Sequence, residues 1–294
     1  MTQVVCVGDV MVDVLARLPG PLAIGSDTPA PIVLLGGGSA ANVAAWLVVA
    51  GVPTTFVGCV GDDELGRHAV AELAAAGVQP AVAVAPGRAT GMCIVLVDAD
   101  GERTMVPAAG ANGALTEAML PARLFAPGTH LHLSGYSLLD DGSRAAARAV
   151  LGRAAGAGCG VSVDASSAAP LRAVGPERFL SWLPPGTLLL ANLAEAVVLS
   201  GQAEATGAAL ALGARCGEAV VKRGPAGAVW SDGRAVLAVE AGAVELVDTT
   251  GAGDAFAAGL LAARLVGADV TASLRAGATL AARAIAEVGA RPGR

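Results

Sequence analysis

The chain has 294 residues, of which 54% are hydrophobic and 15% are charged, and its formal net charge at pH 7 is −6. So apolar a chain has ample material for a buried core, and its acidic balance argues against the basic surface that nucleic acid requires. The length is compatible with two domains or with one large domain and an appendage.

A membrane-spanning segment is not expected. The longest stretch without a charged residue runs from Thr28 to Gly61, but prolines and three consecutive glycines interrupt it, whereas a spanning helix needs about 20 uninterrupted apolar residues. The chain opens on a strand-like segment with no signal-peptide pattern, and its five scattered cysteines predict neither a disulfide framework nor a zinc site. We therefore expect a cytoplasmic protein with no membrane and no nucleic-acid partner.

Short apolar runs alternate with longer helical patterns along most of the chain. In chain order, the pattern predicts strands at 4–7, 54–60, 131–133, 161–163, 188–190 and 219–221, and helices at 40–50, 64–76, 142–157, 205–215 and about 252–265. Fully apolar strands separated by helices are typical of a parallel sheet covered on both faces. We predict an α/β fold with a doubly wound, mostly parallel sheet.

Two stretches, 10–35 and 89–110, interrupt this alternation because they are strand-like and rich in turns, with no helix inside them. Within the second, 92–97 and 103–106 predict a hairpin around an Asp-Gly turn at 98–101. We predict that both stretches form a small β-sheet lid, and that 1–9, 36–88 and 111–294 form the main domain.

The segment D-T-T-G-A-G-D at 248–254 carries the strongest chemical signal. Its glycines allow tight turns where a helix begins, and the exposed N–H groups and helix dipole of such an end form an anion site. Asp254 places a carboxylate inside that site, where it could take a proton from a hydroxyl that attacks a phosphoryl group. The alternative is that Asp254 only caps the helix.

A second glycine-rich segment, G-G-G-S-A-A-N at 36–42, also precedes a predicted helix. It matches the dinucleotide fingerprint G-x-G-x-x-A only formally, because it does not follow the first strand and no acidic residue ends the next strand. Close approach to a small polar ligand, with Asn42 offering its amide, and a tight packing turn both remain open.

Two further segments follow predicted strands, at the sheet edge where parallel sheets bind ligands. Asn192 and Glu195 are spaced to share one helical face, where they could hold hydrated Mg²⁺ near phosphates or simply cap the helix. Residues 222–227 have the composition of a turn that could form a nucleotide wall. A P-loop is excluded because the single lysine, Lys222, is followed by Arg223.

Taken together and in this order, the segments resemble the ribokinase-like (PfkB) family of carbohydrate kinases. The resemblance covers nearly the whole chain, through V-G-D-V-M-V-D at 7–13, G-G-S-A-A-N at 37–42, G-D-D at 61–63, G-A-N at 110–112, N-x-x-E at 192–195, G-x-x-G at 224–227 and D-T-T-G-A-G-D at 248–254. It implies a ribokinase-like fold whose lid covers the substrate and often mediates dimerisation. It also implies ATP-dependent phosphorylation of a hydroxymethyl group on a sugar or sugar-like alcohol.

The resemblance assigns roles to individual residues. Asp254 becomes the catalytic base, and the backbone of Gly251, Ala252 and Gly253 becomes the anion hole. The sugar is expected to meet Asp13, Gly37, Gly38, Asn42 and Asn112, and the nucleotide to meet Asn192, Lys222, Gly224, Gly227 and Thr249. Glu195 is expected to hold Mg²⁺ through water, and Asp248 and Thr250 match a site for K⁺.

The acceptor stays open between ribose, fructose and 2-keto-3-deoxygluconate. Ribokinases usually carry a lysine where this chain has Ser39, and an asparagine where it has Met11, so both positions argue against ribose. A nucleoside kinase of adenosine type and a catalytically idle sugar-binding regulator on the same scaffold are the alternatives. The idle regulator would be expected to lack the base or the anion hole, and neither is missing here.

Overall fold

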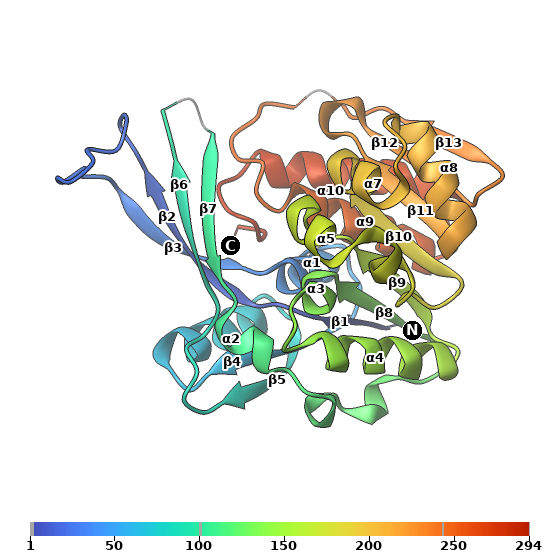
Figure 1. Ribbon diagram of the computed structural model, residues 1–294, viewed down its shortest axis with the longest axis horizontal. Helices are drawn as coiled ribbons and strands as arrows, with labels where there is room; N and C mark the ends of the chain where they lie inside the picture. The colour runs from blue at the N-terminus through green and yellow to red at the C-terminus, as the bar shows by residue number, and fades with distance from the viewer. Residues whose placement is uncertain (1–2, 100–101, 243, 294) are drawn as a thin grey trace.

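The computed structural model describes residues 3–99, 102–242 and 244–293, and its main body is a nine-stranded sheet between two layers of helices (Figure 1). The spatial order is β13-β12-β11-β10-β9-β8-β1-β4-β5. The strands are β1 (Gln3–Val7), β4 (Thr54–Gly61), β5 (Gln79–Ala85), β8 (Thr129–Ser134), β9 (Gly160–Asp164), β10 (Thr187–Asn192), β11 (Gly217–Lys222), β12 (Ala228–Ser231) and β13 (Val236–Val239). All neighbours pair in parallel except β11–β12 and β12–β13, which are antiparallel.

The helices divide between the two faces of this sheet. One face packs against α4 (Arg144–Gly156), α5 (Ala168–Val174), α6 (Pro176–Leu180), α7 (Leu193–Ser200) and α8 (Ala205–Cys216), and α3 (Tyr136–Leu139) follows β8 on that side. The other packs against α1 (Ser39–Val49), α2 (Glu64–Ala75), α9 (Ala252–Leu265) and α10 (Val270–Ile285). Because both faces are covered, central strands such as β4 are buried along their whole length, which is why they are mostly apolar and carry no charged residue.

A second sheet of four strands projects from the main body (Figure 1). Its order is β3 (Ile32–Gly37), β2 (Met11–Arg17), β6 (Met92–Val97) and β7 (Arg103–Ala108). Its own core is small, formed by Leu15, Cys93, Val95 and Val97. We refer to this sheet as the lid.

The predicted fold class is confirmed: a large, mostly parallel sheet with helices on both faces and a smaller separate sheet. The hairpin predicted at 92–106 forms between β6 and β7, and its turn at 98–101 lies partly outside the described residues. The lid strands fall inside 10–35 and 89–110 except that β3 continues to Gly37; the domain boundaries stay a prediction. Within the described residues, no helix combines the length and apolarity needed to cross a membrane.

Candidate active site

The predicted site residues gather where the carboxyl ends of the parallel strands meet the first turns of α1 and α9. Ligands of open parallel sheets bind at this edge. Lys222 ends β11, Asn192 ends β10, and Asp254 lies in the first turn of α9. The lid reaches the same edge because β1 leads into β2 and β3 leads into α1.

The start of α9 has the form expected of an anion site. Gly251 occupies the N-cap position in a left-handed conformation (φ 74°), and no side chain caps the helix. A Cβ on Gly251 would lie 2.4 Å from the backbone oxygen of Ala290, so this close approach requires glycine. Gly253 faces Lys222, whose Nζ would lie 3.1 Å from a Cβ at that position. The helix dipole and a lysine thus converge on one point.

Asp254 does not cap its own helix. Its Oδ1 accepts a hydrogen bond from Ser39 Oγ (2.8 Å), and its Oδ2 accepts one from Asn42 Nδ2 (2.9 Å). Both donors belong to α1, so the two helix starts meet at this carboxylate. Burial raises the pKa of Asp254 to about 7, although the bonds from Asn42 and Ser39 oppose the shift. A carboxylate with that pKa can accept a proton near neutral pH.

Arg291, which is not among the predicted site residues, fixes the orientation of Asn42. Its Nε donates to Asn42 Oδ1 (3.2 Å) and its Nη2 donates to the backbone oxygen of Gly37 (2.6 Å). With its oxygen bonded to Arg291, the Asn42 amide must turn its nitrogen toward Asp254. The C-terminal segment is itself held in place, because Trp46 Nε1 donates to the Ala290 backbone oxygen (2.9 Å).

Asp13 and the glycines at 36–38 form the predicted sugar side of the site. Asp13 is buried on β2, and a Cβ on Gly37 would lie 2.4 Å from its Oδ1, so only glycine fits opposite it. Gly38 precedes α1 with φ 93°, where a Cβ would lie 2.5 Å from the Asp9 backbone oxygen. Burial raises the pKa of Asp13 to about 6, partly offset by the nearby Arg291 guanidinium.

Asn112 lies at the junction between the lid and the main body, with its amide already bonded. Its Oδ1 accepts from Val10 N–H (3.0 Å), and its Nδ2 donates to the backbone oxygens of Val10 (2.9 Å) and Ala109 (3.0 Å). These bonds join the start of β2 to the end of β7. The structure therefore brings Asn112 to the lid junction and commits its amide to the backbone there.

On the nucleotide side, a buried cluster of charges surrounds the end of β11. Lys222 Nζ donates to Asp164 Oδ2 at 2.7 Å. Asn192 and Glu195 form a reciprocal capping box at the start of α7: Asn192 Oδ1 accepts from Glu195 N–H (2.9 Å), and Glu195 Oε2 accepts from Asn192 N–H (2.8 Å). Burial and the neighbouring Asp164 raise the pKa of Glu195. The pair therefore caps α7, which was one of the two alternatives that the sequence offered.

The donors in this cluster fit a hydrated divalent cation. Mg²⁺ usually keeps several waters and binds one or two carboxylates together with substrate phosphates. Glu195 and Asp164 supply two carboxylates, and Asp164, which also pairs with Lys222, is close enough to raise the pKa of Glu195. Asp164 is absent from the predicted site. The available signal was its place directly after the apolar run 161–163, at the same sheet edge as Asn192.

The turn after β11 carries the predicted nucleotide wall. Gly224 and Gly227 both have positive φ, 57° and 84°, and a Cβ on Gly227 would lie 2.0 Å from the Val239 backbone oxygen. The turn therefore depends on glycine for its shape.

Thr249, also predicted to meet the nucleotide, lies in the loop before α9, where its hydroxyl accepts from Arg103 Nη1 at 2.8 Å.

Asp248, the carboxylate predicted to hold K⁺, pairs with the guanidinium of Arg103 instead. Asp248 Oδ1 accepts from Thr250 N–H (2.7 Å) and forms an ion pair with Arg103 of the lid, and Oδ2 accepts from Gly289 N–H (3.0 Å). A guanidinium in contact with the only carboxylate of the expected set repels a second cation. In this arrangement the set does not fit K⁺.

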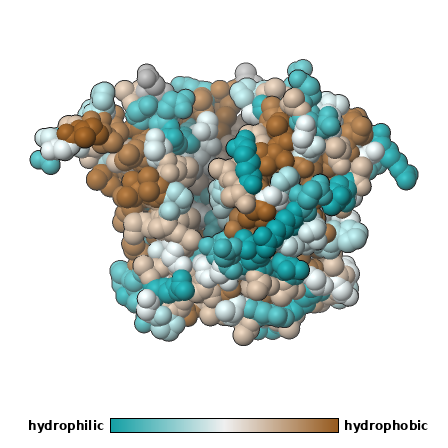
Figure 2. Space-filling model, viewed as in Figure 1, coloured by the Kyte–Doolittle hydropathy of each residue, from teal (hydrophilic) through white to brown (hydrophobic). Residues whose placement is uncertain are grey.

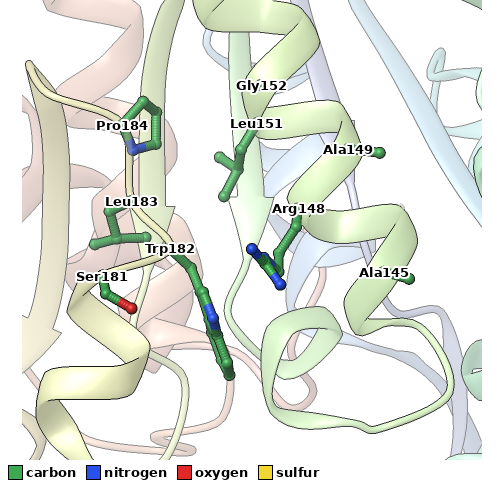
Figure 3. A pocket seen from close by; sticks show the side chains of 9 residues that line it. All are labelled: Ala145, Arg148, Ala149, Leu151, Gly152, Ser181, Trp182, Leu183 and Pro184. Atoms are coloured by element: carbon green, nitrogen blue, oxygen red, sulfur yellow. The ribbon is translucent and has the colours of Figure 1, made fainter.

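Two other features lie apart from this site. A cavity of about 510 Å³ between α4 and the segment after α6 contains none of the predicted site residues (Figure 3).

Within the sheet, His130 Nε2 and His132 Nδ1 both form hydrogen bonds with Ser162 Oγ, at 2.8 and 2.9 Å. Burial lowers the pKa of His130 to about 3 and of His132 to about 4, so both stay neutral, as expected of structural residues.

The fold and the site define a phosphotransferase of the ribokinase-like class, and comparison with known proteins places the chain within it. The family model "pfkB family carbohydrate kinase" matches residues 1–293. An ATP-dependent ribose-1-phosphate kinase of Halopiger xanaduensis is 34% identical over 93% of this chain and 88% of its own length.

Two solved structures extend the comparison to the fold. The adenosine kinase from Sinorhizobium meliloti has a TM-score of 0.90 and 26% identity, covering 99% of this chain and 96% of that one. A ribokinase II of E. coli in complex with ATP and Mg²⁺ has a TM-score of 0.86 and 25% identity, covering 99% and 94%. The chain belongs to the PfkB family of carbohydrate kinases, and it is an ATP-dependent sugar kinase.

Proposed function

We propose that this kinase transfers the γ-phosphoryl group of ATP to a hydroxymethyl group of a sugar or sugar-like alcohol, with Asp254 as the base. The observation that carries the proposal is the Asp254 carboxylate, which Ser39 and Asn42 hold at the uncapped start of α9. This places a proton acceptor beside an anion site, and an alcohol kinase needs these two groups together.

In the proposed reaction, the acceptor hydroxyl oxygen bonds to the γ-phosphorus while the bond from that phosphorus to the β–γ bridging oxygen breaks. ADP leaves, and Asp254 takes the hydroxyl proton. The backbone of Gly251, Ala252 and Gly253 and the α9 dipole stabilise the charge on the transferred group. Glu195 and Asp164 would hold Mg²⁺ through water, and the bound ion would neutralise charge on the phosphates.

The acceptor is proposed to lie between the lid and α1. Asp13 supplies a buried carboxylate for sugar hydroxyls, and Gly37 and Gly38 let the sugar approach the backbone. Asn42 and Asn112 remain predicted contacts, although the Asn42 amide bonds Asp254 and Arg291 and the Asn112 amide bonds the backbone. The nucleotide is proposed to lie along Asn192, Lys222, Gly224, Gly227 and Thr249.

The test measures ADP release from Mg²⁺-ATP with separate acceptors. Ribose 1-phosphate comes first, because the Halopiger relative is named for it, followed by ribose, fructose, 2-keto-3-deoxygluconate and adenosine. We expect ADP release that depends on one acceptor, with the new phosphate ester on a primary carbon by ³¹P NMR. Turnover of adenosine would favour a nucleoside kinase, which the Sinorhizobium neighbour suggests. A sugar that raises the Tm without any turnover would favour the idle regulator.

We further propose a homodimer through the lid. One lid face exposes Ile32, Leu34, Ile94 and Val106, and Figure 2 shows hydrophobic surface gathered over this part of the molecule. Contiguous apolar surface of this kind marks interaction sites. Light scattering on the wild type and on Leu34→Lys tests this: a dimer that the substitution dissociates is expected, and a wild-type monomer would contradict it.

Action in the cytoplasm stays a prediction. Activation by K⁺ at Asp248 and Thr250 is an untested expectation from the sequence, and the ion pair between Arg103 and Asp248 argues against it. Assays with and without K⁺ test it.

A further inference from the structure

A lid arginine reaches the loop that leads into the anion site. Arg103, on β7, forms an ion pair with Asp248, and its Nη1 donates to Thr249 Oγ1 at 2.8 Å. The two charged side chains are 17% and 3% exposed, so both are largely removed from water. This contact joins the lid to the segment immediately before Gly251, across 145 positions of sequence.

Asp248 itself ties together the two segments that shape the start of α9. It accepts the N–H of Thr250, next to Gly251, and the N–H of Gly289, next to Ala290. The Ala290 backbone oxygen is the atom against which Gly251 packs. The position of the anion site therefore depends on Asp248 staying ionised and in place.

A buried carboxylate of this kind needs a compensating positive charge, because an unpaired charge in the protein interior is strongly destabilising. The resemblance to ribokinases led us to expect K⁺ there, but the structure supplies a guanidinium. Arginine stays protonated at all relevant pH values and can bond two acceptors at once. It contacts both Asp248 and Thr249 in this way.

We propose that Arg103 takes the place of the monovalent cation, so that this kinase works without K⁺ and the lid itself delivers the charge that orders the anion site. This inference rests on the proposed function for its activity measurements. It makes Arg103 a positioning residue that acts through Asp248. It also couples the lid to the start of α9, because the charge reaches Asp248 only when β7 lies against that loop.

The surroundings of Arg103 make the idea testable by ion rescue. A cavity of about 260 Å³ borders the pair, lined in part by Arg17, Val97 and Val247. Removing the guanidinium would leave room beside Asp248 for a hydrated ion. An alanine at position 103 should therefore convert a K⁺-independent enzyme into a K⁺-responsive one.

The experiment compares wild type, Arg103→Ala, Arg103→Lys and the control Arg123→Ala, an exposed arginine away from the lid and the cavity, in choline, Na⁺ and K⁺ chlorides at equal ionic strength. We expect wild-type and Arg123→Ala rates to agree within about 2-fold in all three salts. Arg103→Ala should lose about 10-fold or more in choline, within the usual range of coupling between sites, and recover several-fold in K⁺. Arg103→Lys keeps the charge and should remain independent of K⁺.

Thermal unfolding of the same variants provides a readout without turnover. The Tm of Arg103→Ala should rise specifically in K⁺, and that of wild type should not. Strong K⁺ activation of the wild type would overturn the proposal, as would full activity of Arg103→Ala in choline or a loss that K⁺ does not restore. If wild type phosphorylates no acceptor, the proposed function fails, and the Tm comparison still tests the role of Arg103.

Discussion

Two helices of this protein, α1 and α9, begin at glycines and meet at one carboxylate, yet their first turns are completed differently. By contrast, α2, α7 and α10 are each capped by an Asp or Asn side chain. At α1, the carboxylate of Asp9, from the loop between β1 and β2, bonds the first turn: its Oδ2 accepts from Ser39 N–H at 2.8 Å. At α9 no side chain caps the end, and a lysine faces it.

The difference separates the two kinds of ligand. A helix N-terminus already paired with a carboxylate is a poor site for a further anion, so the α1 side suits the hydroxyl groups of the acceptor rather than a phosphate. The uncapped end of α9, next to Lys222, suits the transferred phosphoryl group. Asp254 lies between the two sides: it belongs to α9, and Ser39 and Asn42 of α1 donate hydrogen bonds to it. It is therefore in place to accept the proton of a sugar hydroxyl.

The largest expected effect comes from neutralising the shared carboxylate. Asp254→Asn should lower kcat by about 10²–10⁴-fold, the usual range for a positioned general base, with little change in fold, since the side chain keeps its size. Asp269→Asn is the matched control, because Asp269 only caps α10 through Ala272 N–H (2.7 Å) and asparagine caps as well. Steady-state kinetics with the best acceptor measure both. Equal effects of the two substitutions would contradict the difference in roles.

The next prediction concerns the uncapped end of α9. Gly253→Ala keeps the backbone N–H but should lower kcat/KM, at most by the about 10²–10³-fold that loss of a whole oxyanion donor causes, because the methyl group would occupy space between the helix end and Lys222. The backbone at Gly253 is not left-handed, and the nearest atom is the tip of a flexible side chain, so the fold should persist. Circular dichroism and Tm check this. Gly152→Ala, on α4 with nothing within 4 Å, is the control and should leave the rate unchanged.

The pH dependence tests the electrostatics of the junction. Asp254 must be ionised to accept a proton, and its pKa is about 7 because burial disfavours the charge. The rate should therefore rise with pH through about 7 and fall by up to about tenfold per unit below it. A profile of kcat/KM from acid to neutral pH measures this. A limb near pH 4 would mean that Asp254 keeps an ordinary carboxyl pKa.

The sequence predicted the central sheet well because buried parallel strands are mostly apolar, and this marks 54–60, 131–133 and 188–190 clearly. It did not predict β12 and β13, which are short and extend the sheet antiparallel at its edge. The sequence also predicted that α1 and α9 each begin after a glycine-rich segment. Asp164 and Arg291 were not assigned to the site, since their roles arise from neighbouring strands and from a contact across 249 residues. Such pairings exist only after the chain has folded.

The smallest effect should come from Ser39, the second donor to the shared carboxylate. Ser39→Ala removes one of the two hydrogen bonds that favour the ionised form of Asp254, so the pKa should rise above about 7. The rate at neutral pH should fall only a few-fold, consistent with about 1 kcal/mol for one hydrogen bond, and recover at higher pH. Ser200→Ala is the control, because Ser200 bonds only within α7, to Ala196 (2.6 Å), and to the turn after it. An equal loss of rate at every pH would show that Ser39 orients Asp254 without changing its pKa. A pH–rate profile displaced to higher pH would show that a hydrogen bond from α1 sets the basicity of Asp254 on α9.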